Sequence, residues 1–166
     1  MFEFTESVLV NAPRRVVWDV LRDVDSWWVD SNPEHESLEH LDEFAATEVG
    51  ARLRIREEIG GIPGEAVGVI TAVVPDSAVT WEARASYRWL RLVAVPISEG
   101  VTWRVQSHGD TATVLSARVW AAFPCSVIGR LMEFVFTRLL NGVAKDRRHA
   151  RTELDYLKRI VEGTVA

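Results

Sequence analysis

The sequence predicts one α+β domain, in which a series of strands is followed by a long C-terminal helix. Three observations support this. A segment of alternating apolar and polar residues opens the chain and leads directly into one with helical spacing. About six more strand-like segments follow, separated by turn residues. After Pro124 the spacing becomes helical and stays so to about Glu162. Grouped strands closed by a helix are typical of the α+β class, and 166 residues suffice for one such domain.

The N-terminal elements are a strand and one or two helices. Residues 2–10 alternate between apolar and polar side chains, which predicts a half-buried strand. Asn11-Ala12-Pro13 ends the strand and can start a helix, and residues 14–22 carry apolar side chains at helical spacing. Residues 25–33 contain two adjacent tryptophans and predict a short second helix or a tight loop.

Six further segments predict the remaining strands. They are residues 37–47, 51–59, 65–74, 78–87, 101–108 and 111–122. His108-Gly109-Asp110 predicts a hairpin turn. Residues 60–64, GGIPG, also predict a turn between two strands. They lack the Gly-x-Gly-x-x-Gly spacing of a loop that binds a pyrophosphate. Residues 88–98 predict either an extension of the preceding strand or a structured connection.

The C-terminal segment has one apolar stripe. Its members are Ile128, Leu131, Val135, Leu139, Val143, Ala150, Leu154, Leu157 and Val161. Asn141-Gly142 can bend or break this helix, because glycine weakens a helix interior by roughly 1 kcal/mol relative to alanine.

Composition excludes several classes of protein. A formal net charge of −5 argues against general nucleic-acid binding. The single cysteine, Cys125, cannot form an internal disulfide, and we expect a buried, inert thiol. The N-terminus lacks the pattern of a signal peptide, and Arg130, Glu133 and Arg138 interrupt the most apolar stretch. We therefore expect a cytoplasmic protein without integral membrane association; the sequence does not indicate its oligomeric state.

Residues 10–27, VNAPRRVVWDVLRDVDSW, carry a resemblance to a known family. Further matching words are Gly50-Ala51-Arg52-Leu53-Arg54, Val79-Thr80-Trp81 and the final Leu157-Lys158. Together with the element order, they resemble the START/Bet v 1-like (SRPBCC) superfamily, in particular its bacterial polyketide cyclase/dehydrase-like and lipid-transport branch. The resemblance covers essentially all of residues 1–166. Trp28-Val29-Asp30 departs from the commoner Trp-x-x-Trp spacing, which implies a differently shaped entrance.

The resemblance implies a helix-grip fold, an antiparallel sheet of about seven strands wrapped around the long C-terminal helix with a cavity between them. Members of the superfamily include lipid carriers, hormone receptors, aromatase/cyclases, hydroxylase domains and chaperone activators, so the fold does not settle the function.

Strand alternation and the helical stripe predict which side chains line this cavity. They are Trp81, Val101, Trp103, Val105, Leu115, Ala117 and Val119 from the strands, with Leu131, Val135, Leu139 and Val143 from the helix. The small residues Ala117 and Gly142 would leave volume open. Trp120 can face either way, because the register across the preceding hairpin is not fixed by the sequence.

Catalytic and metal-ligating patterns are weak. His35, His40, His108 and His149 are scattered, and no pair has metal-ligand spacing on one element, so we expect no metal and no cofactor. Asp146 lies near the centre of the helical stripe and His149 near its edge, which makes both candidates for acid/base chemistry. We favour a surface position for Asp146, reached by a bend at Asn141-Gly142, because charged side chains are rarely buried without a partner.

Three functions remain open. The leading hypothesis is a carrier or sensor of a small hydrophobic molecule such as a lipid or polyketide. The second is a polyketide cyclase or dehydratase, for which Asp146, His149 and Glu82 are the acid/base candidates. The third is a protein-interaction module that uses the acidic segment 30–48. Residues 23–51 hold nine acidic side chains and no lysine or arginine, either as a solvated face or as a cavity mouth that discourages anionic ligands.

Overall fold

In the computed structural model, which describes residues 1–59, 61–89 and 93–165, seven strands form one antiparallel sheet. Its order is β1-β7-β6-β5-β4-β3-β2. The strands are β1 (Phe2–Val10), β2 (His35–His40), β3 (Arg52–Ile59), β4 (Ile62–Val74), β5 (Ala78–Trp89), β6 (Val93–His108) and β7 (Ala112–Ala122). The predicted sheet of about seven strands is confirmed.

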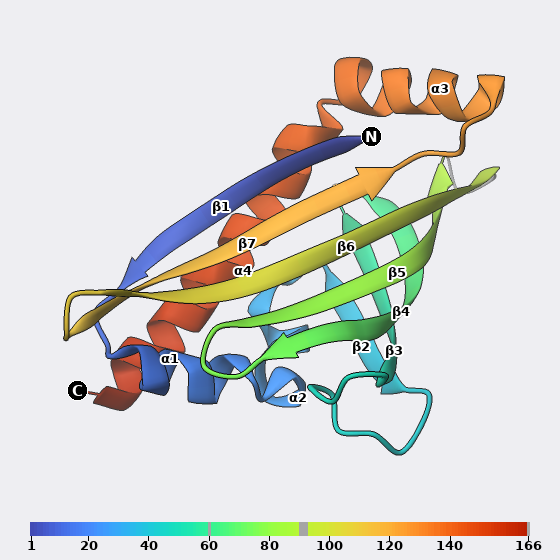
Figure 1. The fold of residues 1–166 in the computed structure, drawn as a ribbon. Coiled ribbons are helices and arrows are strands. Elements are labelled where there is room, and N and C mark those ends of the chain that lie inside the picture. Colours follow the sequence, from blue (N-terminus) through green and yellow to red (C-terminus); the bar gives the residue numbers. More distant parts are fainter. Residues whose placement is uncertain (60, 90–92, 166) are drawn as a thin grey trace.

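The helices lie on one side of the curled sheet and at its ends (Figure 1). They are α1 (Arg14–Leu21), α2 (Val24–Trp27), the 3-10 turn η1 (Val29–Ser31), α3 (Val127–Phe134), the π-helical turn η2 (Val135–Leu139) and α4 (Gly142–Val165). The helix α4 runs diagonally across the sheet and packs against β1 and β7, while α1 and α2 lie at the end near the C-terminus.

Five of the seven strand predictions agree with the structure to within three residues. Two differ more: β2 ends at His40, seven residues before the predicted end, and β6 begins at Val93, eight residues before the predicted strand. Residues 88–89 extend the preceding strand β5, but residues 93–98 form the first part of β6 and pair with β5, which neither predicted alternative described. Residues 90–92 and Gly60 lie outside the described residues. The predicted hairpin at residues 108–110 joins β6 to β7, and Gly109 there has a φ of 72°, which glycine adopts without strain.

The C-terminal segment is not one continuous helix, so the prediction of a single apolar stripe along it is wrong. Asn141, with a φ of 51°, separates α4 from η2. The later stripe residues Ala150, Leu154, Leu157 and Val161 are buried, but the earlier Ile128, Leu131 and Leu139 are exposed. A break and a π-helical turn both change the direction in which later side chains point, so spacing counted across them does not define one face.

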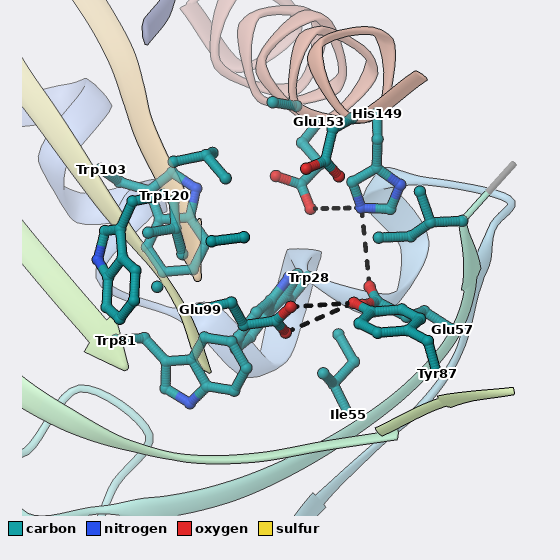
Figure 2. Close-up of a pocket in the computed structure, with 17 residues that line it drawn as sticks. Trp28, Ile55, Glu57, Trp81, Tyr87, Glu99, Trp103, Trp120, His149 and Glu153 are labelled. Carbon is teal, nitrogen blue, oxygen red and sulfur yellow. Dashed lines mark hydrogen bonds and ion pairs between the residues drawn. The ribbon is translucent and has the colours of Figure 1, made fainter. Parts of the chain in front are cut away.

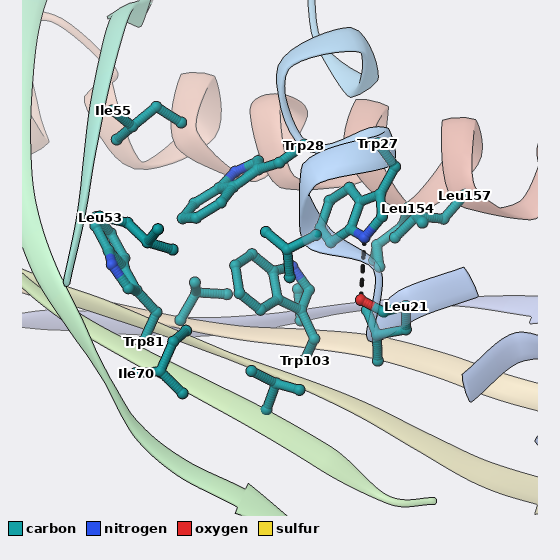
Figure 3. Close-up of a cluster of buried hydrophobic side chains, with 14 of the residues drawn as sticks. Leu21, Trp27, Trp28, Leu53, Ile55, Ile70, Trp81, Trp103, Leu154 and Leu157 are labelled. Carbon is teal, nitrogen blue, oxygen red and sulfur yellow. Dashed lines mark hydrogen bonds between the residues drawn. The ribbon is translucent and has the colours of Figure 1, made fainter. Parts of the chain in front are cut away.

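The core beside α4 is built around tryptophans (Figure 3). The Trp28 ring stands edge-on to those of Trp81 and Trp103, with centroid distances of 5.2 and 5.1 Å. Trp27 packs on Trp103 at 5.5 Å and donates its indole N–H to the Leu21 carbonyl over 3.0 Å. Such edge-to-face contacts stabilise aromatic pairs beyond the effect of area burial. Among the described residues, no helix is long and apolar enough to cross a membrane.

Two glycines make room for aromatic rings, Gly68 on the inner face of the sheet and Gly100 on the outer face. A Cβ at Gly68 on β4 would overlap the indole of Trp81, and a Cβ at Gly100 on β6 would lie 2.7 Å from Nε1 of its cross-strand partner Trp120. We expect Gly68→Ala to lower the free energy of unfolding by about 1–3 kcal/mol, the usual cost of overpacking. Chemical denaturation measures this. Gly163→Ala on α4, where a Cβ meets nothing within 4 Å, is the matched control and should not destabilise. Equal effects of the two changes would contradict the packing described.

Candidate functional site

A cavity of about 80 Å³ lies between α4 and the inner face of the sheet. A smaller pocket of about 30 Å³ adjoins it and shares Tyr87, Glu99 and Asp146 with its wall. A buried water needs roughly 10–15 Å³ of such space, so the cavity has room for several waters or a small group of ligand atoms. The helix therefore does not fill the hollow of the sheet.

One side of the cavity is aromatic. Trp28 comes from the α2–η1 connection, Trp81 from β5 and Trp103 from β6. In Figure 2, Trp81 and Trp103 lie on the side away from His149, and Trp28 lies between them and Tyr87. Within the described part of the chain, the buried N–H groups of Trp81 and Trp103 have no hydrogen-bond partner. This wall can receive the apolar or aromatic part of a ligand.

The other side of the cavity is polar and hydrogen-bonded. The Tyr87 hydroxyl donates to Glu57 Oε1 over 2.6 Å and lies 3.2 Å from Glu99 Oε2. Tyr87 can reach Glu57, two strands away, because the intervening Gly64 has no side chain beneath the phenol ring. Three strands thus place a phenol and two carboxyl groups together (Figure 2).

Two histidines meet beside this cluster, although 114 positions separate them in the sequence. His35 Nε2 at the start of β2 lies 3.0 Å from His149 Nε2 on α4. Glu153, one turn after His149, places Oε1 3.2 Å from His35 Nε2 and 3.5 Å from His149 Nε2. The outer nitrogens also have partners: His35 Nδ1 contacts the Trp28 carbonyl at 2.7 Å, and His149 Nδ1 contacts Glu34 Oε2 at 2.8 Å. His35 and His149 are far apart in the sequence, but the fold brings them into contact, which the sequence pattern did not predict.

Burial and crowding of carboxylates shift the ionisation of the site. Burial raises the pKa of Glu99 well above its usual value, and repulsion from Glu57 and Asp146 adds to this. Burial also raises the pKa of Tyr87 well above its usual value, as does the nearby charge of Glu57. Although burial alone would raise the pKa of Glu153, hydrogen bonds from both histidines lower that pKa to about 2. The site therefore contains carboxyl groups in different protonation states.

Asp146 lines both the cavity and the adjoining pocket. The prediction that Asp146 lies at the surface is therefore wrong. The helix does break at Asn141, but α4 restarts at once and turns Asp146 toward the cavity. Burial raises the pKa of Asp146 to about 7. The charge of His149 lowers this pKa, and the charge of Glu57 raises it further. Asp146 can therefore exchange a proton near neutral pH.

Solved structures of known proteins share this architecture. The ZhuI aromatase/cyclase from Streptomyces sp. R1128 aligns over 99% of this chain and 96% of its own, with a TM-score of 0.70 and 16% identity. A point mutant of Thalictrum flavum norcoclaurine synthase, in complex with a transition-state analogue, has the same coverage and identity and a TM-score of 0.66. A START superfamily protein from Mycobacterium smegmatis covers 90% of this chain and 97% of its own, with a TM-score of 0.51 and 14% identity.

The chain has the START/Bet v 1-like helix-grip fold. No protein-family model and no curated protein matches the sequence, so the likeness rests on three-dimensional structure and concerns the fold. The predicted resemblance is confirmed at that level. A helix-grip fold implies a ligand cavity between helix and sheet, where the cavity of this chain lies.

The helix-grip sheet carries part of the predicted lining. Trp81, Val101, Trp103 and Val119 border the cavity, whereas Trp120 points to the outer face of β7 with its cross-strand partner Gly100. Of the other predicted residues, Val105, Leu115 and Ala117 point inward but are packed in the solid core farther along β6 and β7. Alternation thus predicted the face correctly but not how far along it the cavity extends.

The structure places the four predicted helical residues elsewhere. The described residues that line the cavity do not include Leu131, Val135, Leu139 or Val143, and Leu131 and Leu139 are 61% and 67% exposed. These residues precede or adjoin the break at Asn141, whereas the cavity is covered by the next turns of α4. There Asp146, His149, Ala150 and Glu153 face the sheet.

Several site residues that the sequence reasoning missed had a detectable signal. Glu57 follows Leu53 and Ile55 at alternate positions on β3, and Glu99 precedes Val101 and Trp103 on β6. A glutamate in an otherwise apolar inward series indicates a buried polar site. His35 had no such signal, because it lies before the predicted strand and meets His149 only in the folded chain.

Proposed function

We propose that the chain binds a small, largely hydrophobic molecule in the cavity between α4 and the sheet. The observation that carries this proposal is the division of the cavity wall into an indole side and a hydrogen-bonding side. Ligand pockets generally combine apolar and aromatic surface with a few placed polar groups that fix orientation. Trp28, Trp81 and Trp103 supply the first, and Tyr87 with its neighbouring carboxyl groups supplies the second.

The polar side favours a ligand whose polar end is neutral or cationic. Glu57, Glu99, Asp146 and Glu153 all line the cavity, and no lysine or arginine is among the described residues that do. An anionic head group would be repelled by these carboxylates, whereas a hydroxyl, carbonyl or amine could form hydrogen bonds with them. Because the cavity has only about 80 Å³, a larger ligand requires lining side chains to move as it enters.

A filled-cavity variant tests binding directly. Val119 on β7 lines the cavity, whereas Val114 on the same strand lies on the other face. We expect Val119→Phe to weaken uptake of a neutral fluorescent probe such as N-phenyl-1-naphthylamine at least tenfold, because the ring occupies the ligand's space. Val114→Phe should bind the probe as the unchanged chain does. Fluorescence titration measures both. Absence of probe binding to the unchanged chain, or equal affinity of both variants, would argue against this use of the cavity.

A second candidate function is acid/base catalysis on the bound molecule. It is favoured by Asp146, whose carboxyl faces the cavity and whose pKa is raised to about 7. A group with a pKa near the working pH is suited to both accepting and donating a proton. We expect Asp146→Asn to reduce turnover of a polyketide-like substrate by 10²–10⁴-fold while probe binding persists. Unchanged turnover would exclude Asp146 as the acid/base group.

A further inference from the structure

Four potential metal-ligating atoms converge at the edge of the cavity. They are His35 Nε2, His149 Nε2, Glu57 Oε2 and Glu153 Oε1. The two nitrogens are 3.0 Å apart, Glu57 Oε2 is 3.7 Å from His35 Nε2 and 3.8 Å from His149 Nε2, and Glu153 Oε1 is 3.2 and 3.5 Å from them. Ligands at about 2.0–2.1 Å from a tetrahedral ion lie roughly 3.3–3.4 Å from one another. His35, His149 and Glu57 thus offer three ligand atoms that all lie within 4.8 Å of one another, and Glu153 adds a fourth within reach of both histidines.

These side chains are held away from solvent. The side chains of His35, His149, Glu57 and Glu153 are 0%, 10%, 8% and 7% exposed. They come from β2, β3 and α4, so the folded chain assembles the set from three elements. Burial from several elements fixes the geometry of a site before an ion arrives, unlike clusters of mobile surface carboxylates.

The outer nitrogens of both histidines are arranged as in metal sites. His35 Nδ1 faces the Trp28 carbonyl oxygen, which can only accept, so Nδ1 carries the proton. His149 Nδ1 faces Glu34 Oε2 in the same way. Metal-bound histidines usually donate the other ring N–H to a carbonyl or carboxylate, which fixes the tautomer. In the neutral form, both Nε2 lone pairs then point into the same small space between the two carboxylates.

We propose that His35, His149, Glu57 and Glu153 form a binding site for one divalent first-row metal ion, with zinc-type coordination. An ion between these atoms would be coordinated by two imidazole nitrogens and two carboxylate oxygens. Its positive charge would offset the local excess of negative charge. Two histidines with carboxylate ligands suit Zn²⁺ and, among redox-active ions, Fe²⁺. The alternative is that added protons alone hold the four groups together.

The ion would border the proposed ligand site. Glu57, His149 and Glu153 also line the cavity, next to the Tyr87 hydroxyl. An additional coordination position directed into the cavity would let the ion polarise an oxygen of a bound molecule. Binding of the ion itself does not require that molecule, so a metal titration can fail or succeed independently of the proposed function.

A metal titration of the folded chain tests the site. We expect chelator-treated protein to bind one Zn²⁺ per chain in competition with a chromophoric chelator, and to give Co²⁺ the absorption of a four-coordinate ion. Glu153→Gln keeps the side-chain volume and should weaken Zn²⁺ binding at least 10–100-fold, the range seen even when outer-shell partners are lost. His40→Gln removes a histidine outside the cluster, bonded to Asp25, and should leave the affinity unchanged.

The outcomes separate the alternatives. Three results would overturn the proposal: no stoichiometric binding, loss of binding with His40→Gln, or equal affinity of the unchanged chain and Glu153→Gln. Each would mean that added protons, and not a metal ion, hold the four groups together. If Glu153→Gln does not fold, anomalous diffraction from Zn²⁺-soaked crystals of the unchanged chain decides the matter. A peak between His35 and His149 supports the site, and a peak elsewhere or none refutes it.

Discussion

Replacement of Trp103 by alanine is expected to lower the free energy of unfolding by about 3–5 kcal/mol. Trp103 is 1% exposed and packs edge-on against both Trp27 and Trp28. Its removal deletes a large buried apolar surface and leaves a void that the neighbouring strand backbones cannot close. Urea or guanidinium denaturation, with the slope of the transition compared between proteins, measures the loss.

Trp120→Ala is the matched control for this prediction. Trp120 is partly exposed on the outer face of β7, over Gly100, so its removal leaves the inner indole cluster intact. We expect a smaller loss of stability than for Trp103→Ala, together with a smaller change in probe affinity. A loss for Trp103→Ala below about 1 kcal/mol would show that the cluster is not tightly packed.

Substitution Glu99→Gln is expected to stabilise the protein increasingly as pH rises above about 4.5, the usual pKa of a glutamate side chain. In the folded chain, burial raises the pKa of Glu99 well above that value, and Glu57, Tyr87, Asp146 and His149 face it from β3, β5 and α4. Between the two pKa values, the unfolded chain releases this proton and the folded chain keeps it. Ionisation in the unfolded state therefore lowers stability by up to about 1.4 kcal/mol per pH unit, and glutamine removes this effect.

Denaturation curves at several pH values from 4 to 8 test the sign. Below the unfolded pKa, Glu99 is neutral in both states and the two proteins should differ little. Glu36→Gln, at an exposed position on β2, is the control and should stay within about 0.5 kcal/mol of the unchanged chain throughout. A Glu99→Gln protein that is less stable than the unchanged chain at pH 7, or a difference that shrinks as pH rises, would contradict a neutral buried Glu99.

The sheet was predictable because its pattern is local. Each strand alternates over its own length, and its boundaries coincide with turn residues such as those at 108–110. The C-terminal break was only partly predictable. Asn141-Gly142 marked the position, but apolar spacing on both sides suggested one continuous stripe, and only the left-handed Asn141 separates the two faces.

The polar half of the site was not predictable to the same extent, because its contacts join distant segments. His35 meets His149 across 114 positions, and Tyr87 reaches Glu57 across 30. Glu57 and Glu99 could have been singled out as charged residues in inward-facing series, had β6 been recognised from Val93 onward. No local pattern in the sequence indicates that these groups converge on one cavity.

The indole N–H resonances provide the most direct test that the hollow of the sheet admits a guest. The chain has seven tryptophans, of which Trp28, Trp81 and Trp103 place their indoles at the cavity while Trp18 does not. On titration with a neutral apolar probe followed by ¹H–¹⁵N NMR, these three signals should shift together and saturate, and the Trp18 signal should stay in place. Saturating shifts confined to signals other than these three, or no shift with any neutral probe, would contradict a ligand-binding cavity.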